Sequence, residues 1–240
     1  MVTDLPPPFA TVVFDCDSTL SSIEGICELA GARHAAELGT LTTMVMNGGA
    51  PLEEVYGRRL EIVRPTRSDV QRVGERYIET LLPNVEELVG ALRFLGKRVV
   101  IVSGGLLPPV TRLATHLGIE EVYAVGIHFH RDGSYAGFEE TSPLARAGGK
   151  PEILRTLSDP ADPTRAGAIV LVGDGTTDLE AAPFVARFVA FGGIERREAV
   201  FKKARVTCEV ADFRALVPHL FSQREIETLR SRPEHRRLLE

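Results

Sequence analysis

Apolar and polar positions along the chain separate into two kinds of segment. Short runs of β-branched and other apolar residues recur at intervals long enough to hold a helix; they cover 11–14, 99–102, 122–125, 168–172, 188–191 and, more weakly, 204–208. Runs that are apolar on both faces are typical of parallel strands buried between two layers of helices. The pattern therefore predicts an α/β fold, with a Rossmann-like parallel sheet core flanked by helices.

Two segments depart from this pattern. Residues 125–138 contain two alternating runs joined through an Asp-Gly pair, which predicts a β-hairpin. Residues 21–83 lack strand-like runs and contain helical stretches at 52–62 and 70–82. They predict a small helical cap inserted after the first strand, where it would cover the strand ends as a lid.

The expected organisation thus has three parts. The last nineteen residues mix five Arg with four Glu and few apolar side chains, so we expect a solvated helix or a frayed tail there. The predicted boundaries are a catalytic core formed by 1–20 and 84–221, a helical cap at 21–83 and a charged C-terminal tail at 222–240.

Composition narrows the function classes. The chain has 240 residues, 44% of them hydrophobic, and a net charge of −5, which argues against a nucleic-acid partner. No apolar stretch approaches the roughly 18 residues of a membrane helix, and the N-terminus lacks the features of a signal peptide. The three cysteines show no CxxC pattern and are expected to be reduced thiols. Together these features favour a cytoplasmic protein without membrane or nucleic-acid partners.

Two carboxylates follow the first predicted strand. Asp15 and Asp17 fall where the chain leaves the C-terminal end of 11–14, the edge at which open parallel sheets collect ligands. Two acids so close raise each other's pKa unless a cation lies near them. A carboxylate can attack phosphorus, and a divalent ion can neutralise the phosphate. The alternative is structural: Asp17 and Ser18 would cap the next helix.

Two further motifs carry groups that suit an anion. Ser103-Gly104-Gly105 follows the run at 99–102, and its hydroxyl and backbone N–H groups can approach an oxyanion closely. Lys150 lies in a glycine-flanked start of the helix predicted at 151–157, where the positive helix end also favours phosphate. Taken singly, the first motif fits a plain turn and the lysine fits a solvated surface group.

A second acidic motif follows the run at 168–172. Asp174 can complete a magnesium site with Asp15, because magnesium prefers oxygen ligands. Asp178, four residues later, would then orient a metal-bound water or Lys150. The alternative is a Gly-rich turn with Asp178 in the first turn of a helix, where the dipole favours acids. All four motifs, in this order at successive strand ends, favour the catalytic interpretation.

With these motifs the chain resembles the haloacid dehalogenase superfamily and, within it, the phosphoserine phosphatases with a helical cap. The resemblance extends from about Phe9 to Leu220. It depends on an ordered set of segments, namely 15–20, the cap stretch 46–65, 103–105, the hairpin end 135–138, Lys150, 173–181 and 190–193.

The resemblance implies a role for each matching residue. Asp15 would be the nucleophile that forms an aspartyl-phosphate, and Asp17 would act first as general acid and then as general base. Magnesium would be held by Asp15, the backbone carbonyl of Asp17 and Asp174, with Asp178 beside it. The phosphoryl group and substrate would be bound by Ser103, Gly104, Gly105, Lys150 and Thr177.

The resemblance also implies which ester is bound. Glu24 matches the glutamate that binds a substrate ammonium, Arg59 matches the arginine that binds its carboxylate, and Met46 matches the residue packed over the substrate. Adjacent Arg58 leaves a one-residue alternative. A carboxylate and a guanidinium suit a zwitterionic amino acid, although singly Glu24 could cap a helix and Arg59 could form a surface ion pair.

We therefore expect a Mg2+-dependent phosphatase that hydrolyses O-phospho-L-serine in serine biosynthesis. Three alternatives stay open at this point: a phosphatase for another small phosphomonoester, a phosphotransferase that uses the same aspartyl-phosphate, and a non-catalytic phospho-acceptor module. The last would need neither Asp17 nor a substrate-reading cap. The sequence leaves the oligomeric state, regulation and the preference between L- and D-phosphoserine open.

Overall fold

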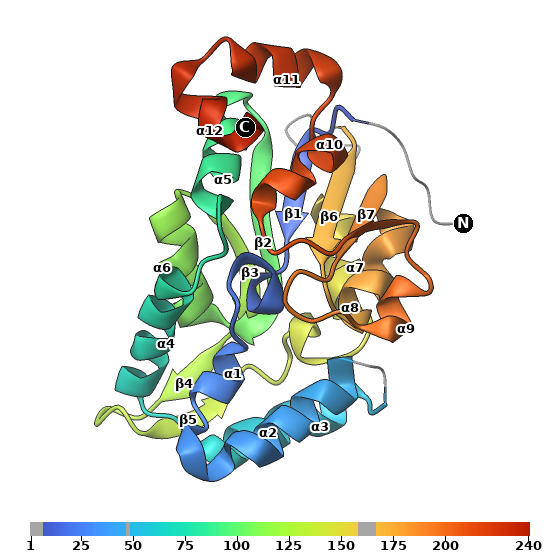
Figure 1. The fold of residues 1–240 in the computed structure, drawn as a ribbon. Coiled ribbons are helices and arrows are strands. Elements are labelled where there is room, and N and C mark those ends of the chain that lie inside the picture. Colours follow the sequence, from blue (N-terminus) through green and yellow to red (C-terminus); the bar gives the residue numbers. More distant parts are fainter. Residues whose placement is uncertain (1–6, 47–48, 158–166) are drawn as a thin grey trace.

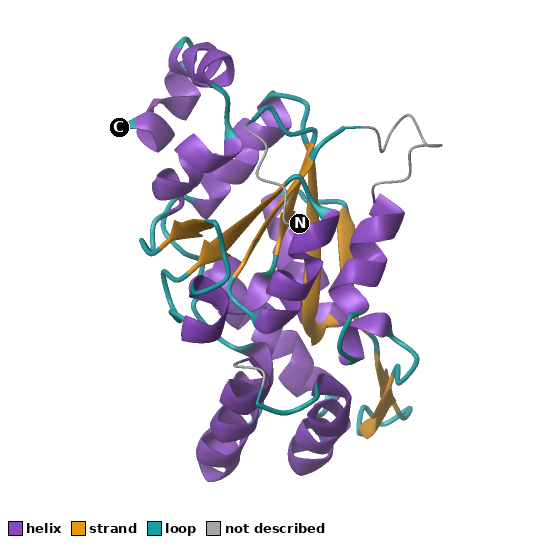
Figure 2. Ribbon diagram, turned by 90° about the vertical axis from the view of Figure 1, so that its right-hand side faces the viewer, coloured by secondary structure: helices purple, strands orange, loops and turns teal. Residues whose placement is uncertain are grey.

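A six-stranded parallel sheet forms the centre of the molecule (Figures 1 and 2). The computed structural model describes residues 7–46, 49–157 and 167–240. The strand order is β3-β2-β1-β6-β7-β8, and helices cover both faces, so the predicted α/β fold class is confirmed. The strands are β1 (Thr11–Phe14), β2 (Arg98–Leu106), β3 (Glu121–Val125), β6 (Ile169–Gly173), β7 (Arg187–Phe191) and β8 (Val206–Cys208).

The two faces of the sheet bury two separate cores. In β1, Val12 and Phe14 pack with α5 (Val85–Phe94) and α6 (Leu107–Leu117) on one face. Val13 points the opposite way and packs with α7 (Gly149–Leu157) and α8 (Thr176–Ala181). Successive side chains of a strand alternate between faces. A continuous apolar run is therefore what a strand covered on both sides needs.

β1 lies in the middle of the sheet, at the point where the strand order reverses. Its last residue, Phe14, pairs with Ile101 of β2 on one side and with Val172 of β6 on the other. In open α/β sheets this switch point opens a crevice at the carboxyl ends of the strands. The residues that follow these three strands are therefore brought together.

One motif expected just beyond a strand lies inside it. β2 continues through Ser103, Gly104 and Gly105 to Leu106. Its pairing with β3 shifts register between Val102 and Leu106. This irregularity is the kind of strand distortion that re-aims backbone groups near active sites. The alternative of a plain turn at 103–105 is therefore wrong.

The hairpin and the insertion take their predicted positions in the chain. β4 (Ile127–Phe129) and β5 (Tyr135–Phe138) pair antiparallel. The described residues between β1 and β2 are mainly helical, and α4 (Arg67–Glu79) packs along α6 of the core. Figure 1 shows α2 and α3 beyond the end of the sheet where β1 finishes. The helices are α1 (Gly25–Glu28), α2 (Gly31–Met46), α3 (Leu52–Val63) and α4 (Arg67–Glu79).

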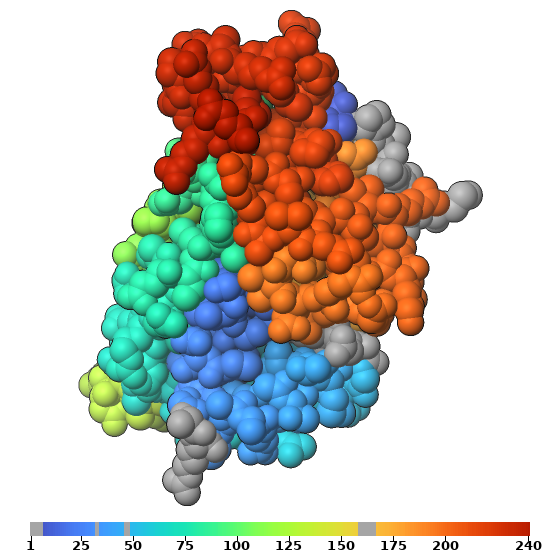
Figure 3. All heavy atoms as spheres, viewed as in Figure 1, coloured from blue at the N-terminus to red at the C-terminus, as the bar shows by residue number. Residues whose placement is uncertain are grey.

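The C-terminal segment is helical and mostly exposed, as the expectation of a solvated helix had it, but two of its side chains dock on the core, so the alternative of a frayed tail is wrong. It contains α11 (Gln223–Arg230) and α12 (Arg236–Leu239), which follow α9 (Glu198–Phe201) and α10 (Val217–Leu220). Leu229 and Leu238 are buried in the core, and the Lys97 amine lies 2.6 Å from Glu225. Figure 3 shows this segment at the end of the molecule opposite α2 and α3. Its few apolar residues suffice because each of the two helices directs its own toward the core, Ile226 and Leu229 from α11 and Leu238 from α12.

None of the helices in the described part of the chain combines the length and apolar character that crossing a bilayer requires.

Candidate active site

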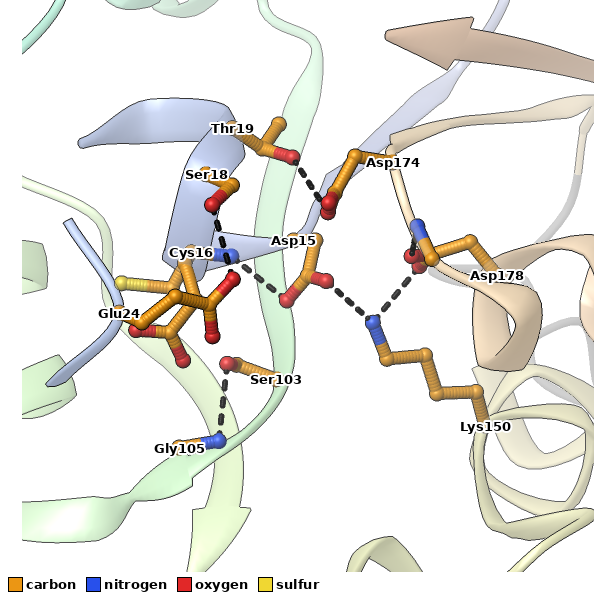
Figure 4. Close-up of polar contacts among 12 residues, drawn as sticks. Asp15, Cys16, Ser18, Thr19, Glu24, Ser103, Gly105, Lys150, Asp174 and Asp178 are labelled. Carbon is orange, nitrogen blue, oxygen red and sulfur yellow. Dashed lines mark hydrogen bonds and ion pairs between the residues drawn. The ribbon is translucent and has the colours of Figure 1, made fainter. Parts of the chain in front are cut away.

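Asp15 stands at the carboxyl end of β1, at the start of the short helical turn η1 (Cys16–Leu20). Its two oxygens have different partners (Figure 4). Oδ1 accepts a hydrogen bond from the backbone N–H of Cys16 at 2.7 Å, and Oδ2 lies 2.7 Å from the Lys150 amine. The side chain is therefore held in one orientation at the edge of the sheet.

Lys150 reaches the site from the first turn of α7. Its amine is buried and contacts Asp178 Oδ1 at 2.7 Å as well as Asp15. Burial by itself lowers the pKa of the amine, but the carboxylates of Asp15 and Asp178 outweigh it and raise the pKa above its usual range. A Cβ on Gly149 would lie 1.8 Å from the Pro143 carbonyl oxygen, so glycine is needed to bring this helix start so close. The lysine is a charged group inside the site, and the surface alternative is wrong.

The acidic motif after β6 supplies two buried carboxylates. Asp178 lies in the first turn of α8, as the structural alternative expected, and its Oδ2 also caps the helix by accepting from the Gly175 N–H at 3.1 Å. Asp174 contacts Thr19 at 3.4 Å and the Arg197 guanidinium at 2.7 Å. Capping and chemistry are thus compatible in this motif, because a carboxylate has two oxygens to use.

Asp15, Asp174 and Asp178 form a group that could hold a metal ion. One carboxylate oxygen from each lies within 4.8 Å of the others, and all three side chains are buried. Burial raises the pKa of Asp174 to about 6, although Arg197 opposes the shift. A divalent cation would favour the ionised carboxylates. A set of oxygen donors alone fits magnesium better than a softer metal.

Asp17 lies on the pocket side of η1. Burial raises the pKa of its carboxyl to about 6, although hydrogen bonds from Tyr77 and Gly25 lower it. An acid whose pKa lies near neutrality can give up a proton in one step and accept one in the next. Asp17 accepts from the N–H of Gly25, the first residue of α1, at 2.7 Å. Asp17 therefore does bond the start of a helix, as the structural alternative expected. That helix is α1, and not the turn η1 to which Asp17 itself belongs.

These groups face one pocket between the sheet edge and the inserted helices. Ser103 is buried, and its Oγ accepts from the Gly105 N–H at 3.0 Å. Met46 is the last residue of α2, and its side chain lies outside the described part of the structure. Ser103 and Asp178 do not line the pocket. The remaining residues proposed from the sequence do, namely Asp15, Asp17, Glu24, Arg59, Gly104, Gly105, Lys150, Asp174 and Thr177.

The choice between Arg58 and Arg59 is decided by the direction of α3. Arg59 is 3% exposed, donates to Thr42 Oγ1 at 3.1 Å and stacks over the Tyr56 ring at 5.3 Å. Among the described residues its Nε has no hydrogen-bond partner. Arg58 is on the outer face, where it approaches Glu37 at 3.9 Å. A buried guanidinium with a free donor, lining a pocket, is a site for an anionic group.

Glu24 places a carboxyl group in the same pocket. Its Oε1 accepts from Ser18 Oγ at 2.8 Å. Burial and the nearby carboxylates of Asp17 and Asp174 raise the pKa of Glu24 to about 8. A substrate ammonium beside it would favour the ionised form.

Arg197 is a buried part of the site that was not expected from the sequence. Its guanidinium bridges Asp174 at 2.7 Å and Glu24 at 3.3 Å, so it links the acidic motif after β6 to the segment before α1. In the sequence it stands beside Arg196, and the two look like equivalent surface charges. Arg196 is indeed paired with Glu209 on the surface at 3.0 Å. Only the fold distinguishes the two neighbours.

Comparison with known proteins agrees with this geometry. A family model described as haloacid dehalogenase-like hydrolase matches residues 12–183. The phosphoserine phosphatase of Bos taurus is 37% identical over 194 residues, which are 79% of this chain and 84% of that protein.

Two solved structures share the fold at 25% identity and cover 90% of this chain and 100% of their own. A substrate-bound phosphoserine phosphatase complex has a TM-score of 0.77, and a phospho-aspartyl intermediate analogue of phosphoserine phosphatase has one of 0.75. The resemblance seen in the sequence motifs is confirmed, and the chain belongs to the haloacid dehalogenase-like hydrolases.

Proposed function

We propose that this protein is a magnesium-dependent phosphatase that hydrolyses O-phospho-L-serine to serine and phosphate, in serine biosynthesis. One observation carries the proposal: a carboxylate at the sheet edge, Asp15, lies 2.7 Å from a buried ammonium in a pocket that also holds a buried, incompletely hydrogen-bonded arginine. The similarity to phosphoserine phosphatases over most of the chain supports the same substrate.

In the first half of the reaction, an oxygen of Asp15 attacks phosphorus. The bond between phosphorus and the serine oxygen breaks, and the serine oxygen takes a proton from Asp17. Lys150, buried and charged beside Asp15, neutralises the phosphoryl oxygens as they approach the carboxylate. Phosphoryl transfer depends mainly on such positioning and charge neutralisation. Ser103, whose Oγ accepts from the Gly105 N–H and keeps its own hydroxyl hydrogen to donate, and the Gly104 N–H would hold the phosphoryl oxygens; Gly105 would position Ser103.

In the second half, water attacks the phosphorus of the aspartyl-phosphate and Asp17 takes the proton from that water. The bond between phosphorus and Asp15 breaks, inorganic phosphate leaves, and Asp15 is regenerated. The same carboxyl thus serves as acid and then as base, which a pKa of about 6 allows.

Magnesium would be held by Asp15, Asp174 and the backbone carbonyl of Asp17, with Asp178 beside it. When bound, the ion supplies positive charge to the phosphoryl oxygens and orients them toward the nucleophile. Arg197 holds one oxygen of Asp174 at 2.7 Å and so fixes the direction of this ligand. Lys150 holds Asp178 in the same way.

The amino-acid part of the substrate is bound on the side of the inserted helices. Glu24 would accept hydrogen bonds from the ammonium group, and Arg59 would donate to the carboxylate. A guanidinium can bind a carboxylate through two parallel hydrogen bonds, which fixes orientation as well as charge. Met46, at the end of α2, and Thr177 would complete the substrate contacts.

A panel of small phosphomonoesters assayed with magnesium tests the proposed function. We expect phosphate release from O-phospho-L-serine with a kcat/KM well above those for phosphocholine and glucose 6-phosphate, because neither of these two esters carries both the ammonium and the carboxylate that Glu24 and Arg59 would bind. Inclusion of glycerol as an acceptor should leave free phosphate as the main product. A preference for any other ester, or phosphoglycerol as the main product, would contradict the proposal.

Replacement of Arg59 by alanine is expected to separate two substrates. The loss of a charge-assisted bidentate contact costs about 1.5–3 kcal/mol, so kcat/KM for phosphoserine should fall about 10- to 100-fold. p-Nitrophenyl phosphate has no carboxylate and should be affected by less than about 3-fold. Steady-state kinetics on both esters measure the split.

Arg58→Ala is the matched control, because it removes the same side chain one residue away, on the outer face of α3 where 64% of the side chain is exposed. It should leave both substrates unchanged. If Arg59→Ala weakened turnover of both esters equally, its role in binding the carboxylate would be refuted.

A further inference from the structure

Tyr77 is a buried residue of α4 that touches the reaction centre. Its side chain is fully buried in the core, among residues that pack against the sheet. Its hydroxyl donates to Oδ1 of Asp17 at 2.6 Å. The sequence motifs did not indicate Tyr77, because it lies far from them along the chain, in a helix of the insertion. A buried tyrosine hydroxyl needs a partner, and here the partner is the acid–base carboxylate.

The two oxygens of Asp17 are in different surroundings. Oδ1 receives two donors, the Tyr77 hydroxyl and the Gly25 N–H at 2.7 Å, and in the described residues both hydrogen bonds of this side chain end on that atom. Oδ2 faces Gly105, where a Cβ would lie only 3.0 Å from it. Gly105 lines the pocket beside Asp15. One oxygen is therefore anchored and the other faces the place of the chemistry.

The anchoring depends on a close fit between Tyr77 and Gly25. A Cβ at position 25 would lie 2.1 Å from the tyrosine oxygen and 2.8 Å from the ring carbon that carries it. Only glycine therefore lets the ring enter far enough for the hydroxyl to reach Asp17. The two donors to Oδ1 come from the first turn of α1 and from α4, so the insertion holds the carboxylate from two directions.

We propose that Tyr77 is a positioning residue: its hydroxyl fixes Oδ1 of Asp17, so that Oδ2 is the oxygen that delivers the proton to the leaving alcohol and receives it from water. This rests on the proposed phosphatase function. In the first step the proton on Oδ2 passes to the serine oxygen as the phosphorus–oxygen bond breaks. In the second, Oδ2 takes a proton from the attacking water, and Tyr77 keeps its own proton throughout.

The leaving group distinguishes this role from a purely structural one. Serine leaves as an alcohol and needs a proton as the bond breaks, whereas p-nitrophenol leaves as a stable anion with little need of one. A wrongly placed Asp17 should therefore lower kcat/KM for phosphoserine and not for p-nitrophenyl phosphate. This ratio reports the steps up to release of the alcohol. We expect Tyr77→Phe to lower kcat/KM for phosphoserine by about 10-fold or more, a part of the roughly 100- to 10,000-fold that general acid catalysis contributes. For p-nitrophenyl phosphate the loss should be less than about 3-fold.

Tyr56→Phe is a matched control, because Tyr56 is also buried and its hydroxyl donates to a backbone oxygen, that of Gly104 at 2.9 Å. Its loss should be similar on both esters. A double-mutant cycle completes the test: once Asp17 is replaced by asparagine, Tyr77→Phe should cause no further loss on phosphoserine, because the group that it positions is gone.

Equal losses on both esters for Tyr77→Phe, or full additivity with Asp17→Asn, would overturn the positioning role. These outcomes are separate from a failure of the proposed function, which the wild-type panel decides. If the wild-type protein preferred another alkyl phosphate, the same comparison of Tyr77→Phe would be made with that ester against p-nitrophenyl phosphate.

Discussion

Asparagine in place of Asp15 is expected to abolish phosphate release while leaving the fold intact. The amide keeps the size of the carboxyl, and its single oxygen can still accept from either the Cys16 N–H or Lys150, which contact different oxygens of Asp15 at 2.7 Å in the native protein. It cannot attack phosphorus. We expect kcat to fall at least about 1,000-fold, the scale on which removal of a nucleophile acts.

Phosphate release and thermal unfolding, measured on the same preparation, test this expectation. Asp132→Asn, an identical exchange at an exposed position of the hairpin, is the matched control and should retain full activity. An Asp15→Asn protein that still turned over phosphoserine, with native unfolding, would remove Asp15 from the role of nucleophile.

Removal of divalent ions is expected to stop turnover completely, and magnesium to restore it. Without a divalent cation, the carboxylates of Asp15, Asp174 and Asp178 have oxygens within 4.8 Å of one another, and the two buried cations that contact them, Lys150 and Arg197, offset only part of their repulsion of the phosphate. Treatment with a chelator followed by titration of magnesium into the phosphate-release assay measures this dependence.

Asp174→Asn gives a readout that does not depend on activity. Magnesium should raise the melting temperature of the wild-type protein, because an ion that binds only the folded state stabilises it. The variant should need a several-fold higher magnesium concentration for the same increase. Turnover in the chelated protein, or an identical magnesium response of the variant, would contradict the metal site proposed here.

The parts of the fold that could be predicted follow from short-range patterns. A strand buried on both faces must be apolar at every position, so the runs at 11–14, 99–102 and 168–172 identify β1, β2 and β6 without further information. Once these strands are parallel neighbours, the polar residues after them must share an edge. Asp15 and Asp174 could therefore be assigned to one site before any distance was known.

The C-terminal segment shows where that logic ends. Its composition is dominated by charge, and the few apolar residues carry little weight in a local average. Leu229 and Leu238 nevertheless enter the core, each from its own helix, and an ion pair between Lys97 and Glu225 joins the segment to the rest of the molecule. The composition of a segment therefore does not predict which of its side chains are buried, because burial depends on the part of the fold against which the segment packs.

By itself, the sequence determined the sheet, the order of the motifs and the chemistry that they can support, because each of these depends on residue type and on contacts along one element. Only the tertiary structure decided that Arg59, and not Arg58, lines the pocket, and that Arg197, and not Arg196, is buried against Asp174 and Glu24. It also decided that Tyr77 reaches Asp17. Neighbouring residues on a helix or loop point in different directions. The residues that each side chain then contacts come from distant parts of the chain, so local sequence does not show which neighbour is buried.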